Sequence, residues 1–232
     1  MALESSPVLS VIIIAFNGSN QLQKCIGSLR SQARFHECEV HIVSKIPGTQ
    51  VVADAAENIQ WHPGPAKETI PSMRSLGIAH AKAELIALLE DDCTVGPDWL
   101  ASLLGAHQSA YPAVGGGIDP GDYSRGMDWA VYYCEYARFL TPYNGIVKAL
   151  PGNNVSYKRG SLGSVASQGF FEIFFHQALR EAGTDLVAAE GMTVVNNHRR
   201  GISDCISIPY HHGRAYASQR FSGQQVSRRL LY

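Results

Sequence analysis

The most constraining feature of this 232-residue sequence is a short apolar run that ends in three carboxylates. Residues 85–89 read Leu-Ile-Ala-Leu-Leu, and Glu90, Asp91 and Asp92 follow at once. An apolar run of this length, without helical spacing, is typical of a strand buried on both faces of a sheet. The chain must therefore place three acids where a buried strand leaves the core.

These three acids suggest two interpretations, and the run alone does not decide between them. In an extended chain, Glu90 and Asp92 share one face and Asp91 faces the other. Carboxylates this close raise each other's proton affinity unless a cation lies between them, and a divalent ion completed by substrate phosphates suits such a site. A solvated acidic turn before the next helix explains the same residues equally well.

Alternating strand and helix patterns predict an α/β fold. The helix after the first strand is expected to begin at Asn20, with Gln23 in a capping-box position. Strand, helix and strand at this spacing indicate βαβ units and a largely parallel sheet. The expected strands are residues 8–16, 39–43, 58–61, 85–89, 114–119 and 192–195, and the expected helices are 20–29, 71–83, 97–107, 123–143 and 169–183.

The aromatic residues between positions 123 and 143 have helical spacing. Sugar rings stack on aromatic side chains, so a role in binding an acceptor is one interpretation of this segment. A helix that packs on the sheet explains the spacing better.

Composition fits one large globular domain, or one domain with a small appendage, because 45% of the residues are hydrophobic and 17% are charged. The net charge of −1 gives no gross bias toward nucleic acid, so no nucleic-acid partner is expected. The five cysteines are an odd number and none has C-x-x-C spacing. This pattern is typical of reduced thiols in a cytoplasmic protein. No secretory signal is expected before the first strand, and the longest apolar runs are too short to span a bilayer.

Positive charge gathers near the C-terminal end. Residues 198–232 contain six arginines and one acid, Asp204. A basic tail of this kind suggests contact with phosphates or with an anionic membrane. The membrane surface in question would be the inner face, reached from the cytoplasm. A solvated helix face explains the same charges nearly as well. The sequence stops mid-pattern at Tyr232, as expected of a truncated chain.

Two common nucleotide-binding motifs are absent from the sequence. The loop at residues 17–20, Asn-Gly-Ser-Asn, is not G-x-G-x-x-G, and no G-x-x-x-x-G-K-[ST] occurs. These absences exclude the dinucleotide fingerprint and the P-loop class. A bound nucleotide must therefore be held by another kind of site.

Three segments, SVIIIAFNGSNQLQKCIGSL, MRSLGIAHAKAELIALLEDD and GPDWL, resemble family 2 glycosyltransferases of the GT-A fold in both order and spacing. This resemblance implies a Rossmann-like, mostly parallel central sheet flanked by helices, followed by a helical basic tail. It implies a GT-A catalytic domain at residues 1–198, with a nucleotide-sugar half at 1–100 and an acceptor half at 101–198. Residues 199–232 form the tail.

The same resemblance assigns roles to individual residues. It implies donor contacts at Ala15, Asn17, Ser44, Arg74 and Asp91, and the basic cluster at residues 210–214 suggests a further diphosphate contact at Arg214. It implies metal ligands for Mn²⁺ or Mg²⁺ at Glu90, Asp92 and His198, and acceptor contacts at Asp119, Asn153 and Asn154. It also implies a catalytic base at Glu172, because the interval from Glu172 to Gly183 matches the family.

Glu172 and the Asn153–Asn154 pair each have a simpler explanation. A carboxylate among phenylalanines is poorly solvated, which favours a general base, yet an acid in a helix's first turn is also ordinary helix electrostatics. Two adjacent amides beside a glycine bind sugar hydroxyls or phosphate, yet asparagine is equally common in turns.

The sequence departs from the family at several of these positions. Ser44 follows the second strand, where base-binding acids are common, and Ser75 replaces an asparagine. Glu90 replaces an aspartate, Ile173 replaces the second acid of a usual pair, and Asn197 holds a position that is often histidine. These differences leave open which nucleotide is bound, more than the class of reaction.

The implied reaction is a single displacement with inversion by a hexosyltransferase. The donor is a UDP- or GDP-linked sugar, and the acceptor is a glycan, a lipid-linked sugar or another hydroxyl compound. A non-catalytic nucleotide-sugar-binding module is the main alternative, because several family residues are altered. A sugar-phosphate nucleotidyltransferase fits less well, because residues 17–20 form no glycine-rich basic loop.

Overall fold

The β-branched run near the N-terminus forms β1 (Leu9–Ala15), and every residue in it is buried. In the computed structural model, which describes residues 6–50, 57–65, 69–163 and 169–220, β1 lies at the middle of four parallel strands. It pairs with β2 (Cys38–Ser44) on one side and with the acidic strand β4 (Leu85–Glu90) on the other. The fourth strand, β3 (Ile59–Pro63), lies beside β2.

Beyond β4 the sheet continues with β9 (Asn154–Lys158), β6 (Ala113–Gly115), β10 (Leu186–Ala188) and β8 (Gly145–Val147). β9 runs antiparallel to both β4 and β6, and β8 runs antiparallel to β10. The other pairs are parallel, which confirms the predicted mostly parallel sheet. The sequence pattern did not predict β9, which fills the position between the two halves.

A second sheet contains β5 (Cys93–Val95), β11 (Val194–Asn196) and β7 (Ile118–Pro120). The prediction of a single strand at residues 114–119 was wrong. The chain forms two short strands there, β6 in the large sheet and β7 in the second sheet. The division occurs at Gly116, where an added Cβ would lie 1.6 Å from the carbonyl oxygen of Met192. Only glycine allows the two backbones to approach so closely.

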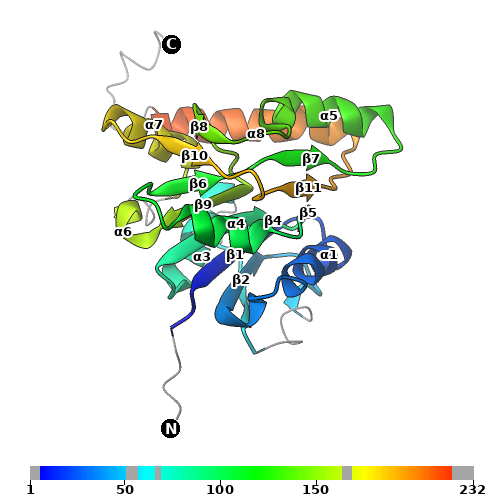
Figure 1. The fold of residues 1–232 in the computed structure, drawn as a ribbon. Helices are drawn as coiled ribbons and strands as arrows, with labels where there is room; N and C mark the ends of the chain where they lie inside the picture. Colours follow the sequence, from blue (N-terminus) through cyan, green and yellow to red (C-terminus); the bar gives the residue numbers. More distant parts are fainter. Residues whose placement is uncertain (1–5, 51–56, 66–68, 164–168, 221–232) are drawn as a thin grey trace.

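Helices cover both faces of the large sheet (Figure 1). The first helix begins at Ser19 after Gly18, with no side-chain cap, so the expected capping role of Asn20 was wrong. A capping box does occur elsewhere, between Thr69 and Ser72. The helices are α1 (Ser19–Arg30), α3 (Ile70–His80), α4 (Trp99–Ala106), α5 (Gly126–Tyr136), α6 (Arg159–Leu162), α7 (Glu172–Glu181) and α8 (Ile202–Arg220), with 3-10 turns at Phe35–Glu37 and Ala137–Phe139.

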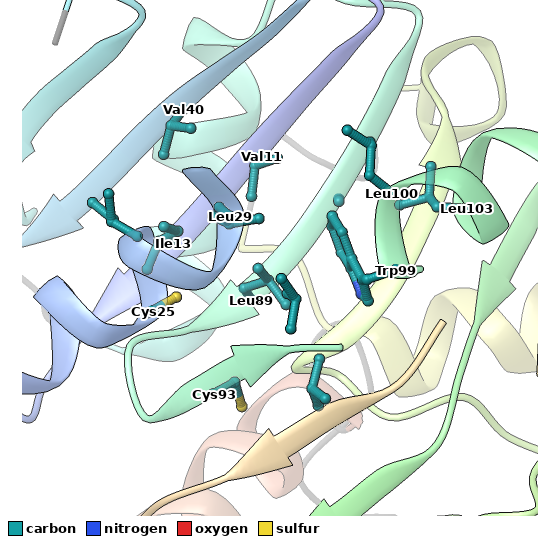
Figure 2. Close-up of a cluster of buried hydrophobic side chains, with 14 of the residues drawn as sticks. Val11, Ile13, Cys25, Leu29, Val40, Leu89, Cys93, Trp99, Leu100 and Leu103 are labelled. Atoms are coloured by element: carbon teal, nitrogen blue, oxygen red, sulfur yellow. The ribbon is translucent and has the colours of Figure 1, made fainter. Parts of the chain in front are cut away.

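Two apolar clusters lie on opposite faces of the large sheet. In the first, shown in Figure 2, Leu29 of α1 and Trp99 of α4 pack against Leu89 of β4. Met73 of α3 and Phe175 of α7 belong to the second. Each fully buried side chain of this size contributes roughly 1.5–3 kcal/mol. This packing fixes the end of β4, from which the acids emerge.

The C-terminal helix α8 lies against α5 and α7 at the upper end of Figure 1. The Tyr216 ring stacks on Phe174 with centroids 4.9 Å apart, and Cys205 Sγ lies 3.5 Å from Met127 Sδ. The described part of the predicted basic tail is therefore helical and packed on the rest of the chain; residues 221–232 lie outside the described residues. Among the described helices, none has both the length and the apolar character needed to cross a membrane.

Three histidines stack on the α3 face of the sheet, away from the acids of β4. The His62 ring lies 4.1 Å from His80 and 5.2 Å from His41, measured between centroids. Burial and the neighbouring imidazoles lower the pKa of His41, and together they lower that of His62 to about 4. Glu39 opposes this effect at His41, whereas Lys82 adds to it.

This histidine stack predicts acid sensitivity. A histidine whose pKa is lowered by folding costs stability as pH falls through its unfolded value, because the unfolded chain then binds protons that the fold refuses. His62→Asn should therefore reduce the loss of unfolding free energy between pH 7.5 and pH 5.5 by about 1 kcal/mol. Urea unfolding at the two pH values measures this, and His36→Asn is the control because that ring is 78% exposed. Equal losses in His62→Asn and the parent would contradict the prediction.

Candidate active site

The three acids of β4 point to three different sets of partners. β4 ends at Glu90, so Asp91 and Asp92 lie in a turn before β5. The extended backbone assumed for the alternation of these acids therefore ends at Glu90. Glu90 and Asp92 still share neighbours, because the charges of both raise the pKa of Arg200, and the charge of Asp92 raises the pKa of Glu90.

Asp91 holds the loop that follows β1. Its Oδ2 accepts hydrogen bonds from the backbone N–H groups of Phe16, at 3.1 Å, and Asn17, at 2.8 Å. Its Oδ1 accepts a third from the Asn17 side-chain amide, at 2.8 Å. Burial raises the pKa of Asp91, whereas these donors lower it. Asp91 therefore positions Asn17, which is exposed at the end of β1.

Arg74 of α3 lies between two carboxylates instead of facing open solvent. It is buried, its Nη1 donates to Glu172 Oε2, and its Nη2 lies 3.4 Å from Glu90 Oε1. Nη2 also donates to the carbonyl oxygen of Gly152 at 2.9 Å. Burial raises the pKa of Glu90 and the nearby guanidinium opposes that rise. Arg74 thus joins the predicted base to the first predicted metal ligand.

Gly152 leaves no room for a side chain beside this pair. A Cβ there would lie 2.5 Å from Glu172 Oε1 and 2.7 Å from Arg74 Nη2. Gly152→Ala should therefore displace Glu172. With Glu172 as the predicted base, the predicted transfer activity should fall about tenfold to a hundredfold, since a small misplacement of a catalytic group has an effect of this size. Steady-state kinetics measures the change. Gly160→Ala is the control, because its Cβ would meet open space; an equal loss in both variants would contradict the role of Gly152.

Asp92 and His198 carry buried polar atoms that have no hydrogen-bond partner within the described part of the chain. These atoms are Asp92 Oδ2 and His198 Nε2, in side chains that are almost fully buried. Burial raises the pKa of Asp92 and lowers that of His198 to about 4. An unpartnered buried carboxylate costs free energy, so the arrangement calls for a group that the protein itself does not supply.

The orientation of His198 suits a metal ligand. Its Nδ1 faces the side-chain oxygen of Asn196 and lies 3.2 Å from the Tyr123 hydroxyl. Because an amide oxygen only accepts, we infer that Nδ1 carries the proton and that Nε2 presents a lone pair. The Asn196 side chain also hydrogen-bonds Asp92. Asn196 therefore links the two unpartnered groups.

Two protein ligands fit a divalent ion that also takes phosphate and water oxygens. Within the described residues, no group of three or more His, Cys, Asp or Glu side chains is arranged to hold a metal ion by itself. Glu90 remains close to Asp92, but its contact with Arg74 makes it a weaker ligand than the sequence suggests.

The predicted acceptor residues divide into different roles. Asn153 lies beside the exit of β4, is almost fully buried and has an Oδ1 with no partner among the described residues. Asn154 is fully buried, and its side chain bonds Trp99, Gly117 and Met192, so its amide holds neighbouring segments together. Asp119 lies on β7 and accepts a hydrogen bond from Thr141.

Three predicted donor residues do not bring side chains to this cluster. Ala15 and Ser44 are fully buried, and the Ser44 hydroxyl donates to the Ala15 carbonyl oxygen at 3.0 Å. Arg214 is exposed on α8, where its guanidinium lies 5.6 Å from the centre of the Tyr210 ring.

Arg200 lies at the candidate site, although the sequence did not predict it there. It follows β11, and it is close enough to Asp92, Glu135 and Glu90 for their charges to raise its pKa against the effect of burial. A hydrogen bond from the Asn197 N–H to the Asp92 carbonyl oxygen, at 2.7 Å, holds this segment against the acidic turn. The adjacent arginines 199 and 200 could have indicated an anion site here, but both were assigned to the predicted basic tail.

A hollow of about 560 Å³ lies beside Asn17 and His198, between α1, the loop after β7 and the segment after β11. Gln21 spans one side of it, because its amide donates to the Asn197 carbonyl oxygen at 2.9 Å. The hollow is lined by Asn17, Asn20, Gln21, Lys24, Asp122, Tyr123, Ser124, Asp128, Asn197, His198 and Arg199. Its polar walls suit a hydrophilic ligand.

Comparison with solved structures gives the fold. A mannosyltransferase, PcManGT from Pyrobaculum calidifontis, in complex with GDP-Man and Mn²⁺, superposes with a TM-score of 0.67 at 15% identity over 96% of this chain and 66% of that one. GalNAc-T7 with UDP, GalNAc and Mn²⁺ gives 0.62 at 14% identity over 84% and 45%. The chain thus spans less than two thirds of the length of both proteins. Both are GT-A glycosyltransferases, so the predicted GT-A fold is confirmed.

Sequence comparison gives the family. The family model for Glycosyl transferase family 2 matches residues 10–163, which include most of β1, the acidic turn and β9. None of the curated proteins compared with the chain matches it. Since the family match covers more than half of the chain and the fold agrees with it, the chain belongs to glycosyl transferase family 2.

Proposed function

We propose that the chain is an inverting hexosyltransferase that moves a sugar from a UDP- or GDP-linked donor to a hydroxyl acceptor, with Mn²⁺ or Mg²⁺ bound. The observation that carries this proposal is the pair of buried, unpartnered atoms Asp92 Oδ2 and His198 Nε2 at the exit of β4. Family membership supports sugar transfer, and both structural neighbours were solved with Mn²⁺ and a nucleotide or nucleotide sugar.

Asp92 and His198 would hold the metal ion, with Glu90 as a third ligand beside them. When bound, the ion supplies positive charge to the diphosphate that leaves the donor sugar. Arg200 adds a second positive charge near Asp92, where a guanidinium can bind phosphate oxygens. Its Nε is buried and has no partner among the described residues, so it has donor capacity left for a ligand.

Asn17 and the backbone around it would bind the nucleoside. Asp91 fixes Asn17 through three hydrogen bonds, so this loop is already ordered before a ligand arrives. The polar hollow beside Asn17 and His198 offers room for the nucleotide next to the metal ligands. β1 and β2 end side by side at Ala15 and Ser44, with Ala15 just before this loop.

Glu172 would take the proton from the acceptor hydroxyl as that oxygen attacks the sugar. It begins α7, and Arg74 holds its Oε2. The buried guanidinium of Arg74 thus holds the carboxylate in one position at the start of the helix. One base and no second nucleophile imply a single displacement with inversion of the anomeric centre.

Asn153 and Asp119 would contact the acceptor, and Asn153 offers its unpartnered Oδ1 for a hydroxyl group. The acceptor itself is a glycan, a lipid-linked sugar or another hydroxyl compound. We also propose that the enzyme acts in the cytoplasm near an anionic membrane surface, since residues 198–232 carry six arginines and one acid.

The test is a panel of UDP- and GDP-sugars with MnCl₂ or with EDTA, read by thermal shift and by release of nucleoside diphosphate. We expect at least one donor to raise the melting temperature, and to be turned over, only when Mn²⁺ is present. Equal binding and turnover in EDTA would contradict the role of the metal. The absence of any shift or turnover with all donors would contradict the proposed function.

A non-catalytic nucleotide-sugar-binding module is the second candidate. The observation that favours it is the contact between Arg74 and both Glu172 and Glu90, which leaves these acids less free than in the sequence-based interpretation. In that case donors would still raise the melting temperature with Mn²⁺, but no nucleoside diphosphate would be released.

A further inference from the structure

Exposed hydrophobic side chains gather at one end of the molecule. Among the described residues, every large hydrophobic side chain that is exposed belongs to the second half of the chain, between positions 127 and 210. The elements that carry most of them, α5, β8, α7 and α8, lie together at the upper end of Figure 1, opposite the N-terminus. An apolar surface confined to one end of a molecule marks a contact surface.

Helix α8 carries the clearest part of this surface. Ile202, Ile206 and Tyr210 follow one another at four-residue spacing, and their exposed fractions are 72%, 72% and 61%. This spacing places the three side chains along one side of the helix. Cys205 and Tyr216, on another side, contact Met127 and Phe174 of the body. The stripe of Ile202, Ile206 and Tyr210 is therefore exposed beside the contacts that hold α8 on the body.

Arginines flank this stripe. Arg199 is exposed just before α8, and Arg214 is exposed beside Tyr210, with its guanidinium 5.6 Å from the ring centre. The one acid of this region is Asp204. Its Oδ2 accepts a hydrogen bond from the Gly201 N–H, just before α8, at 2.8 Å. The surface is thus apolar along its centre and positive at its margins.

We propose that the stripe and its two arginines, together called the α8 face, dock on an anionic membrane surface. Isoleucines with a tyrosine between arginines form the side-chain pattern of a helix that lies in the lipid interface, with apolar groups among the acyl chains and guanidinium groups at the phosphates. The arginines at the margins disfavour association of two copies through their α8 faces, because their positive charges would then lie together.

This inference deepens the proposed function but does not rest on the transfer chemistry. His198 and Arg200 come only a few residues before Ile202, so the docked helix brings the proposed diphosphate site close to the lipid surface. A lipid-linked acceptor is then the class of acceptor that fits best. Failure of docking would leave donor binding and metal dependence unaffected, so the two proposals are separable.

The test is co-sedimentation of the full 232-residue chain with vesicles of phosphatidylglycerol or of phosphatidylcholine alone. We expect binding to phosphatidylglycerol that weakens at high salt, and little binding to phosphatidylcholine. The double variant Ile202→Ser/Ile206→Ser should reduce binding at least about tenfold, because it removes the apolar contact. Both positions are highly exposed, so the variant should fold, and an unchanged melting temperature checks this.

The charge contribution is tested with a matched pair of variants. Arg199→Gln/Arg214→Gln should weaken binding to phosphatidylglycerol about tenfold or more, because each arginine near an anionic surface contributes to binding. Arg30→Gln/Lys82→Gln removes the same charge from exposed positions elsewhere and should leave binding unchanged.

Three results would overturn the proposal. The first is that the parent chain does not bind phosphatidylglycerol vesicles. The second is that the double serine variant binds as well as the parent. The third is a concentration-dependent dimer, seen by size-exclusion chromatography with light scattering, that the serine substitutions dissociate; a second copy of the chain would then cover the α8 face.

Discussion

Replacing Glu172 by glutamine is expected to lower kcat by about 10²–10⁴ and to leave donor binding unchanged, which is the effect of losing a general base. Glu172 is the carboxylate that begins α7, and its Oε2 accepts from Arg74. Glutamine keeps an oxygen that can accept the same hydrogen bond, so the variant should fold. It has no carboxylate to take the proton of the acceptor hydroxyl.

The measurement is steady-state transfer with the donor found in the nucleotide-sugar panel, together with donor affinity from the thermal shift. Glu181→Gln is the matched control, because this acid lies exposed at the other end of α7. A Glu172→Gln enzyme with undiminished kcat would exclude Glu172 as the base. A loss of donor affinity equal to the loss of kcat would show that Glu172 acts in binding instead.

Replacing Asp92 by asparagine is expected to abolish measurable metal-dependent turnover and, in the absence of metal, to stabilise the fold. The stabilisation follows from burial, because Asp92 Oδ2 has no hydrogen-bond partner among the described residues and its pKa is raised. An acid whose pKa is raised by folding costs stability at pH values above its unfolded pKa, and this cost disappears below that value.

The gain is expected to be about 2 kcal/mol at pH 8, or roughly 5 °C in melting temperature, and to vanish near pH 4. Thermal unfolding in EDTA at the two pH values measures it. Asp98→Asn is the control, because Asp98 is exposed and makes no capping hydrogen bond at α4. If Asp92→Asn lowered the melting temperature of the metal-free protein, the carboxylate would stabilise the fold itself, which would contradict its role as a metal ligand.

Most of the fold could be predicted from the sequence, because local patterns carry it. The β-branched run of β1 and the apolar run of β4 admit few structures other than buried strands, and both form as expected. The α1 pattern gives a helix whose buried residues are Leu22, Cys25, Ile26 and Leu29. The two errors at Gly116 and at β9 concern which sheet a segment joins, which depends on distant backbone contacts and not on local spacing.

The candidate site was predicted less completely, because its contacts join residues far apart in the chain. The sequence predicts functional roles for Arg74 and Glu172, but it does not show that they bond each other across 98 positions. It identifies His198 but not Asn196, which orients the ring and reaches Asp92. Arg200 was assigned to the tail because its proximity to Asp92 exists only in the folded chain.

Direct titration with Mn²⁺ tests the central claim, which is that Asp92 and His198 hold a cation at the exit of β4. Isothermal calorimetry of the parent chain with UDP or GDP present should give one Mn²⁺ site per chain, and Asp92→Asn and His198→Ala should each weaken it at least about tenfold. Asp98→Asn should bind like the parent. Undiminished Mn²⁺ binding by both Asp92→Asn and His198→Ala would contradict the account.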